Sequence, residues 1–157
     1  MKGMLGLTSP RDLLAKLRHE HELLHQDSDN AYVAFNFFVT AEHLLDWLYP
    51  GNAGKARREQ LRGQEVLLQI VSHIANGAKH FVVEAKHHKA VSASGRLGSF
   101  FPSSYFGSGY FGSGYFGKGR LTLHLTGDAA TAFGSSVAPI DLADKVLAYW
   151  EACPDLR

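Results

Sequence analysis

Two histidines and a glutamate near the N-terminus form the most specific chemical motif in the chain. His21, Glu22 and His25 match the pattern H-E-x-x-H of zinc hydrolases. Residues four apart share one face of a helix, so both imidazoles would bind one zinc ion and the glutamate would act as a general base. The motif is not followed by a third ligand at the extended spacing, and a chain with nine histidines also produces it by chance. The nearest alternatives for a third ligand are Glu42, His43 and Asp46.

A second group of candidate residues lies on two later predicted helices. One face of each helix carries short amides, hydroxyls and imidazoles, whereas Lys and Glu usually fill a solvated face. If the helices pack antiparallel, these groups would form a cleft suited to metal binding or to phosphodiester cleavage. The alternative is that they are solvated or hydrogen-bonded within the core. The candidate catalytic residues are His43, Asp46, His73, Asn76, Lys79 and His80.

A glycine-rich segment repeats a pair of aromatic residues every five positions. The unit Tyr105-Phe106-Gly107-Ser108-Gly109 recurs from residue 110, and again from residue 115 with Lys118 in place of the serine. Three copies are too few to form a solenoid. Either the aromatic side chains pack on the rest of the protein, or the loop 104–119 exposes them to a protein partner, to a nucleic acid or to a second copy of the chain. The candidate partner-binding residues are Tyr105, Phe106, Tyr110, Phe111, Tyr115 and Phe116.

Helical spacing of apolar residues predicts the elements that must position these groups. Ser9 and Asp12 form a capping pair before the first apolar stripe, and the break at Pro50-Gly51 separates two long central helices. Alternation predicts strands at 81–85 and 121–126, paired as a hairpin. We therefore expect one mainly α domain over residues 1–157, a helical bundle with a small antiparallel β-hairpin that carries the glycine and aromatic loop. The expected segments are helices 9–26, 30–49, 55–78 and 140–152 and the hairpin 81–126, with a kink at Gly63 in the third helix.

The composition of the chain limits which classes of partner and which cellular compartment fit it. The formal net charge is +1, so nucleic acid is possible as a partner but is not favoured by charge. The single cysteine, Cys153, excludes an intramolecular disulfide and fits a reducing compartment. No apolar run is long enough to span a bilayer, and the N-terminus has no signal-peptide pattern. We expect a cytoplasmic protein without a membrane partner.

Three stretches of the chain resemble a family of small bacterial helical proteins that has no assigned activity. They are residues 36–47, residues 73–81 and the aromatic-glycine repeat, followed by a C-terminal helix with Tyr149-Trp150. The resemblance implies a bacterial origin. A weaker resemblance is to HEPN-type helical bundles, whose ribonuclease motif is an arginine with a histidine several residues later. Here the helix that ends at His80 has Asn76 and Lys79 but no arginine at that spacing.

Three functions therefore remain open, and whether the protein is an enzyme is open with them. The leading hypothesis is a non-catalytic binding or assembly protein, which forms a homo-oligomer or binds a protein partner through the aromatic repeat. The second is an RNA-directed nuclease of stress or phage-defence type, which the HEPN resemblance implies. The third is a zinc-dependent hydrolase built on His21, Glu22 and His25.

Overall fold

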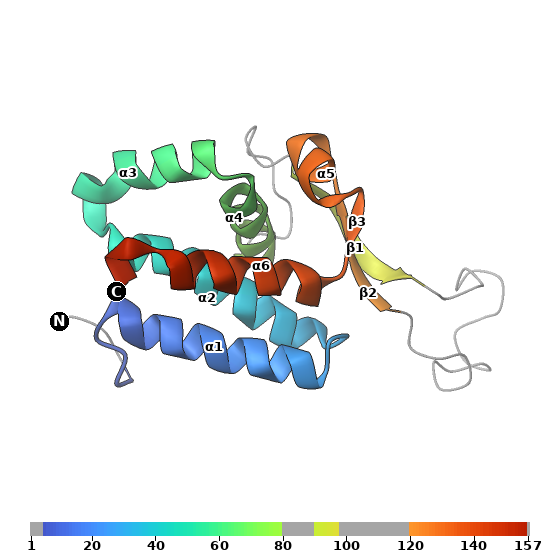
Figure 1. Ribbon diagram of the computed structural model, residues 1–157, viewed down its shortest axis with the longest axis horizontal. Helices are drawn as coiled ribbons and strands as arrows, with labels where there is room; N and C mark the ends of the chain where they lie inside the picture. Colours follow the sequence, from blue (N-terminus) through green and yellow to red (C-terminus); the bar gives the residue numbers. More distant parts are fainter. Residues whose placement is uncertain (1–4, 80–89, 98–119, 157) are drawn as a thin grey trace.

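The structure is a computed structural model that describes residues 5–79, 90–97 and 120–156. These residues form a mainly α-helical fold with a small antiparallel sheet, as predicted (Figure 1). The helices are α1 (Pro10–Gln26), α2 (Ala31–Leu48), α3 (Gly51–Gln64), α4 (Val66–Lys79), α5 (Gly127–Phe133) and α6 (Pro139–Ala152). The strands are β1 (Val91–Leu97), β2 (Arg120–Leu125) and β3 (Ser136–Val137), and a 3₁₀ turn spans Pro154–Leu156.

The core lies between α1, α2, α4 and α6. Figure 1 shows α1, α2 and α6 lying lengthwise, whereas α4 is strongly foreshortened and therefore crosses them. The apolar stripe predicted for α2 is buried as expected, and α6 buries the stripe that includes Val146 and Trp150. The largest fully buried side chains are Leu17, Leu24, Phe37, Phe38, Leu44, Leu45, Leu68, Ile70, Val71, Leu142, Val146 and Trp150.

Both of the first two helices begin where the sequence predicts. Ser9 and Asp12 form a capping box, in which the Asp12 backbone N–H donates to Ser9 Oγ and the Ser9 N–H donates to the Asp12 carboxylate. The side-chain oxygen of Asn30 accepts hydrogen bonds from the backbone N–H groups of Tyr32 and Val33 at the start of α2. These caps fix the direction in which α1 and α2 leave their loops.

The single helix predicted over 55–78 is wrong, because the structure has two helices there. Glu65 is extended (φ −111°, ψ 104°) and separates α3 from α4, two residues beyond the kink expected at Gly63. Pairing of Arg62 with Glu42 and of Arg58 with Asp46 shows that α3 runs antiparallel to α2. The break lets polar α3 lie along α2 while apolar α4 turns into the core.

The partner predicted for the second hairpin strand is also wrong. Strand β2 agrees with the predicted strand 121–126, but it pairs with β1 in the register Ser94↔Leu123, and β3 pairs on its other edge with Leu123↔Val137. Both edges of β2 are thus occupied, and residues 81–85 lie outside the described residues. Strand β1 does alternate polar residues with apolar or small ones, but it contains Ala, Gly and Ser where β-branched or aromatic residues usually mark a strand, so its strand signal in the sequence is weak. No helix in the described part of the chain is long and apolar enough to cross a membrane.

Candidate metal centre

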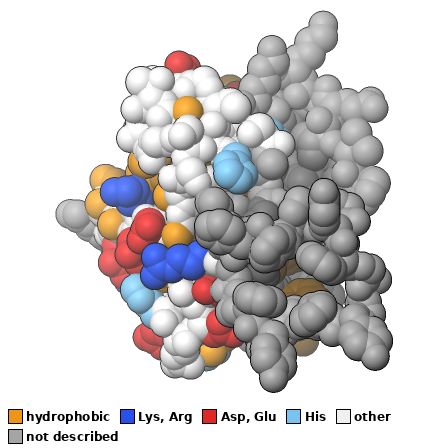
Figure 2. Space-filling view, turned by 90° about the vertical axis from the view of Figure 1, so that its right-hand side faces the viewer, with side chains coloured by type: hydrophobic (Ala, Val, Ile, Leu, Met, Phe, Trp, Pro, Cys, Tyr) orange, Lys and Arg blue, Asp and Glu red, His pale blue; other side chains and the backbone are white. Residues whose placement is uncertain are grey.

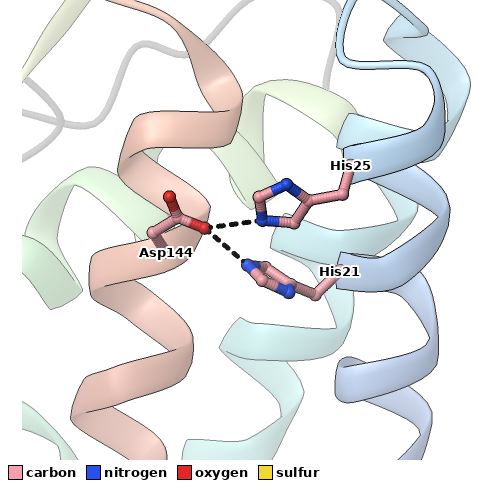
Figure 3. Close-up of side chains that lie close together, drawn as sticks. All are labelled: His21, His25 and Asp144. Carbon is pink, nitrogen blue, oxygen red and sulfur yellow. Dashed lines mark hydrogen bonds and ion pairs between the residues drawn. The ribbon is translucent and has the colours of Figure 1, made fainter.

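The two histidines of the H-E-x-x-H motif lie on α1 and point at a carboxylate on α6 (Figure 3). His21 Nε2 lies 2.7 Å from Asp144 Oδ1, and His25 Nε2 lies 3.0 Å from the same oxygen. The three ligand atoms all lie within 4.8 Å of one another. Among the described residues, this is the one group of three or more His, Cys, Asp or Glu side chains close enough to hold a metal ion.

Packing of the first and last helices brings the three side chains together. Helix α1 buries Leu17 and Leu24 in the core, and α6 buries Val146. Residues at the border of each buried face, such as His21 on α1 and Asp144 on α6, therefore lie next to each other. The helices run antiparallel, because Arg18 Nε lies 2.8 Å from Glu151 Oε1 at the other end of the contact. The four-residue spacing of the histidines then aims both imidazoles at one position on α6.

The imidazole rings are also held by ring contacts. The His21 and His25 rings meet edge to face, with centroids 4.5 Å apart and an angle of 74° between the planes. On its other side the His21 ring lies 6.0 Å from the ring of the buried Phe37 on α2. His21 is therefore the more fixed of the two, with 17% of its side chain exposed against 53% for His25.

The site favours the ionised form of its carboxylate. Burial alone would raise the pKa of Asp144, but hydrogen bonds from His21 and His25 outweigh it and hold that pKa below its ordinary value. An ionised carboxylate and two imidazole nitrogens are ligands that zinc commonly takes in proteins.

The separations fit a metal ion after a small adjustment. In a tetrahedral zinc site with bonds of about 2.0 Å, ligand atoms lie about 3.3 Å apart. The His–Asp separations of 2.7 and 3.0 Å are a few tenths of an ångström shorter. The side chains of His25 and Asp144 are about half exposed, so they have room to move apart. Three protein ligands leave a further coordination position, which is the pattern of catalytic rather than structural zinc sites.

The carboxylate of this site was not found from the sequence. The alternatives named for the third ligand do not take that place: Glu42 pairs with Arg62 and Asp46 pairs with Arg58, both across α2 and α3, and His43 is exposed. Asp144 stands next to the buried Ala143 of the apolar stripe of α6, which marks it as an edge residue. The sequence does not reveal that this edge lies against α1.

The general base of the motif stays a prediction. Glu22 is exposed and follows His21 directly, so it projects about 100° around α1 from that histidine. It is not one of the three residues that converge.

The described residues of the second predicted site do not gather into a group of metal ligands, and several have other partners. Asp46 Oδ1 lies 3.0 Å from Arg58 Nε. His73 Nδ1 accepts a hydrogen bond of 3.1 Å from the Val91 N–H, which ties α4 to β1, and burial lowers the pKa of His73. The Asn76 amide donates to the Ser72 carbonyl oxygen of its own helix at 2.8 Å. The described geometry therefore gives no support to a nuclease cleft there.

Several predicted residues cannot be placed in this description. His80 and the side chain of Lys79 lie outside the described residues, and so does the aromatic repeat with Tyr105, Phe106, Tyr110, Phe111, Tyr115 and Phe116.

Comparisons with protein-family models, with curated proteins and with solved structures give no match to this chain. Inference of function therefore depends on the geometry of the site and on the sequence.

Proposed function

We propose that the protein binds a divalent metal ion, zinc in the first instance, through His21, His25 and Asp144. The observation that carries the proposal is the convergence of two imidazole nitrogens and one carboxylate oxygen from two helices within 4.8 Å. One lone His–Asp pair would be an ordinary surface contact. Here a single oxygen faces two imidazoles that the i, i+4 spacing aims at it, and this donor set matches zinc.

The residues present define the role of each ligand. Asp144 supplies negative charge at the site, His21 is fixed by Phe37 and His25, and the exposed His25 can adjust to the ion. When bound, zinc would supply a Lewis acid and lower the pKa of a coordinated water to about 7. Hydrolysis would also need a general base, and Glu22 is the candidate that the motif supplies, although it lies outside the converging group.

Zinc titration by isothermal calorimetry tests the proposal, with protein purified without a His tag and stripped by chelator. We expect His21→Ala, His25→Ala and Asp144→Asn each to weaken zinc binding by about 100-fold or more, because each removes a direct ligand. His19→Ala is the matched control, since His19 is exposed on the same helix but outside the group. Equal zinc affinity in the His19 and His21 variants, or no binding by the unaltered protein, would overturn the proposal.

A separate assay distinguishes a hydrolase from a protein that only binds metal. Glu22→Gln should leave the zinc affinity unchanged and abolish any zinc-dependent hydrolysis of an activated ester. Zinc binding without hydrolysis in the unaltered protein would keep the metal site and remove the enzymatic role.

The assembly role of the aromatic repeat is a second proposal, supported by its five-residue period alone. If it is correct, changing Tyr110 and Phe111 to Ser should dissociate an oligomer or a partner complex, measured by light scattering. An unchanged assembly state would count against it. A nucleic-acid partner gains no support from charge, because acidic and basic side chains are mixed on the described part of the face in Figure 2.

A further inference from the structure

Helix α3 differs from the other long helices in how it is attached. None of its 14 residues, all of them described, is buried. Leu61 is half-buried and packs on the edge of the core, while the neighbouring α2 carries a full buried stripe. Hydrophobic burial therefore contributes little to holding α3 in place.

Two ion pairs attach α3 to α2. Arg58 Nε lies 3.0 Å from Asp46 Oδ1, and Arg62 Nη2 lies 2.5 Å from Glu42 Oε1. The two arginines are one helical turn apart, and so are the two carboxylates, so the pairs form a matched ladder between antiparallel helices. The Glu42 side chain is only 11% exposed, which shields the inner pair from solvent.

Both ends of α3 are suited to act as hinges. It begins at Pro50 and Gly51, where Gly51 has a φ of +66° that other residues rarely adopt. It ends at Glu65, the single extended residue before α4. Arg58 also donates hydrogen bonds to the Tyr49 and Gly51 carbonyl oxygens, so one side chain joins the first hinge to the ion-pair ladder.

We propose that α3 is a releasable arm that leaves α2 when the Arg58–Asp46 and Arg62–Glu42 ion pairs are broken, while α1, α2, α4 and α6 stay folded. A free helix of this length is marginal in water, so α3 loses its helical structure on release. Release exposes the Glu42 carboxylate and leaves the already half-exposed Asp46, one turn away on α2, without its arginine partner. Screening of charge by salt favours the released state.

Hydrogen–deuterium exchange with mass spectrometry tests this proposal on the full chain. In the unaltered protein, amides of residues 51–64 should exchange faster than those of α4, and added salt should increase the difference. The double variant Arg58→Gln, Arg62→Gln should speed exchange in α3 by about tenfold or more and leave α2 and α4 unchanged. Lys55→Gln is the matched control, because it removes one positive charge from α3 whose partner, Glu59, lies in the same helix.

A charge swap completes the design. Arg58→Asp alone should speed exchange in α3, and adding Asp46→Arg should restore part of the protection, because the ion pair is rebuilt with its signs exchanged while the hydrogen bonds from Arg58 to Tyr49 and Gly51 stay lost. Three results would overturn the proposal: unchanged exchange in the double variant, an equal rise across α2 and α4, or an α3 without protection in the unaltered protein at low salt.

Discussion

The α1–α6 contact and the α2–α3 contact are both antiparallel helix pairs with ionisable side chains across them, but they combine those side chains differently. Between α2 and α3, two arginines meet two carboxylates one to one. Between α1 and α6, two imidazoles meet one carboxylate oxygen. Matched opposite charges hold a helix in place, whereas two imidazoles beside one carboxylate form a ligand set for a cation.

The two contacts also differ in the apolar surface behind them. Both α1 and α6 bury an apolar stripe, so their ligands stand on elements fixed by the core. Helix α3 buries none of its side chains and depends on polar attachments. The packing of each helix therefore determines the role of its ionisable side chains. On α1 and α6, which are fixed by the core, these side chains can be preorganised for a ligand. On the weakly packed α3, they determine whether the helix stays attached to α2.

The largest difference between the two contacts should be the effect of bound zinc on the free energy of unfolding. Zinc at about 100 times its dissociation constant should raise the free energy of unfolding by about 2.7 kcal/mol, because the ion binds the folded chain. Asp144→Asn should reduce this gain to about 0.4 kcal/mol or less at the same zinc concentration, and the double variant Glu42→Gln, Asp46→Asn should retain it. Urea denaturation with and without zinc measures both. Loss of the gain in the α2 double variant would contradict the separation of the two contacts.

Two glycines of α3 should respond in opposite directions to the same substitution. A Cβ at Gly54 would lie 2.0 Å from the Tyr49 carbonyl oxygen, so Gly54→Ala should destabilise the protein by about 1–3 kcal/mol despite the higher helix propensity of alanine. A Cβ at Gly63 has no such neighbour within 4 Å, so Gly63→Ala should stabilise it by about 0.5–1 kcal/mol. Thermal unfolding of the two variants compares them. Stabilisation by Gly54→Ala would show that α3 does not start against Tyr49.

A smaller effect should appear in the pH dependence of stability at the α2–α3 contact. Burial raises the pKa of Glu42 above its ordinary value of 4.5, and the attraction of Arg62 only partly offsets this. The folded state thus holds the proton more tightly than the unfolded chain. The resulting stabilisation is full below about pH 4.5 and is lost as the pH rises through the raised pKa.

The variant Glu42→Gln isolates this effect because it cannot titrate. The unfolding free energy of the unaltered protein relative to this variant should fall between about pH 4.5 and neutral pH in urea denaturation. A difference that stays constant over this range, or that rises with pH, would show that Arg62 rather than burial sets the state of Glu42.

Local sequence signals predicted the parts of the structure that depend on neighbouring residues. The Ser9 and Asp12 capping box, the stripe of α2 and the fold class follow from spacing within one element. Prediction of the two histidines at i and i+4 likewise required only one helix. Prediction of Asp144 would have required knowledge that α1 packs on α6. That contact joins residues more than a hundred positions apart and has no effect on the local periodicity of the sequence.

The errors have the same origin. The break at Glu65 follows from the different surroundings of α3 and α4, although Gly63 had indicated a kink nearby. The cleft expected from polar faces stays a prediction, because His80 and the side chain of Lys79 lie outside the described residues. Its condition of two antiparallel helices is met by α2 and α3, whereas α4, with His73 and Asn76, crosses α2. Polar residues at helical spacing do not reveal which neighbouring element a helix face contacts.

The most direct test of the central claim is X-ray absorption at the zinc edge of the loaded protein. We predict two imidazole nitrogens from the chain, one carboxylate oxygen, and a light oxygen ligand in the remaining position, with bonds of about 2.0–2.2 Å. In Asp144→Asn the carboxylate contribution should disappear. A spectrum with three or more imidazoles, with sulfur from Cys153, or with no change in Asp144→Asn would contradict a site made of His21, His25 and Asp144.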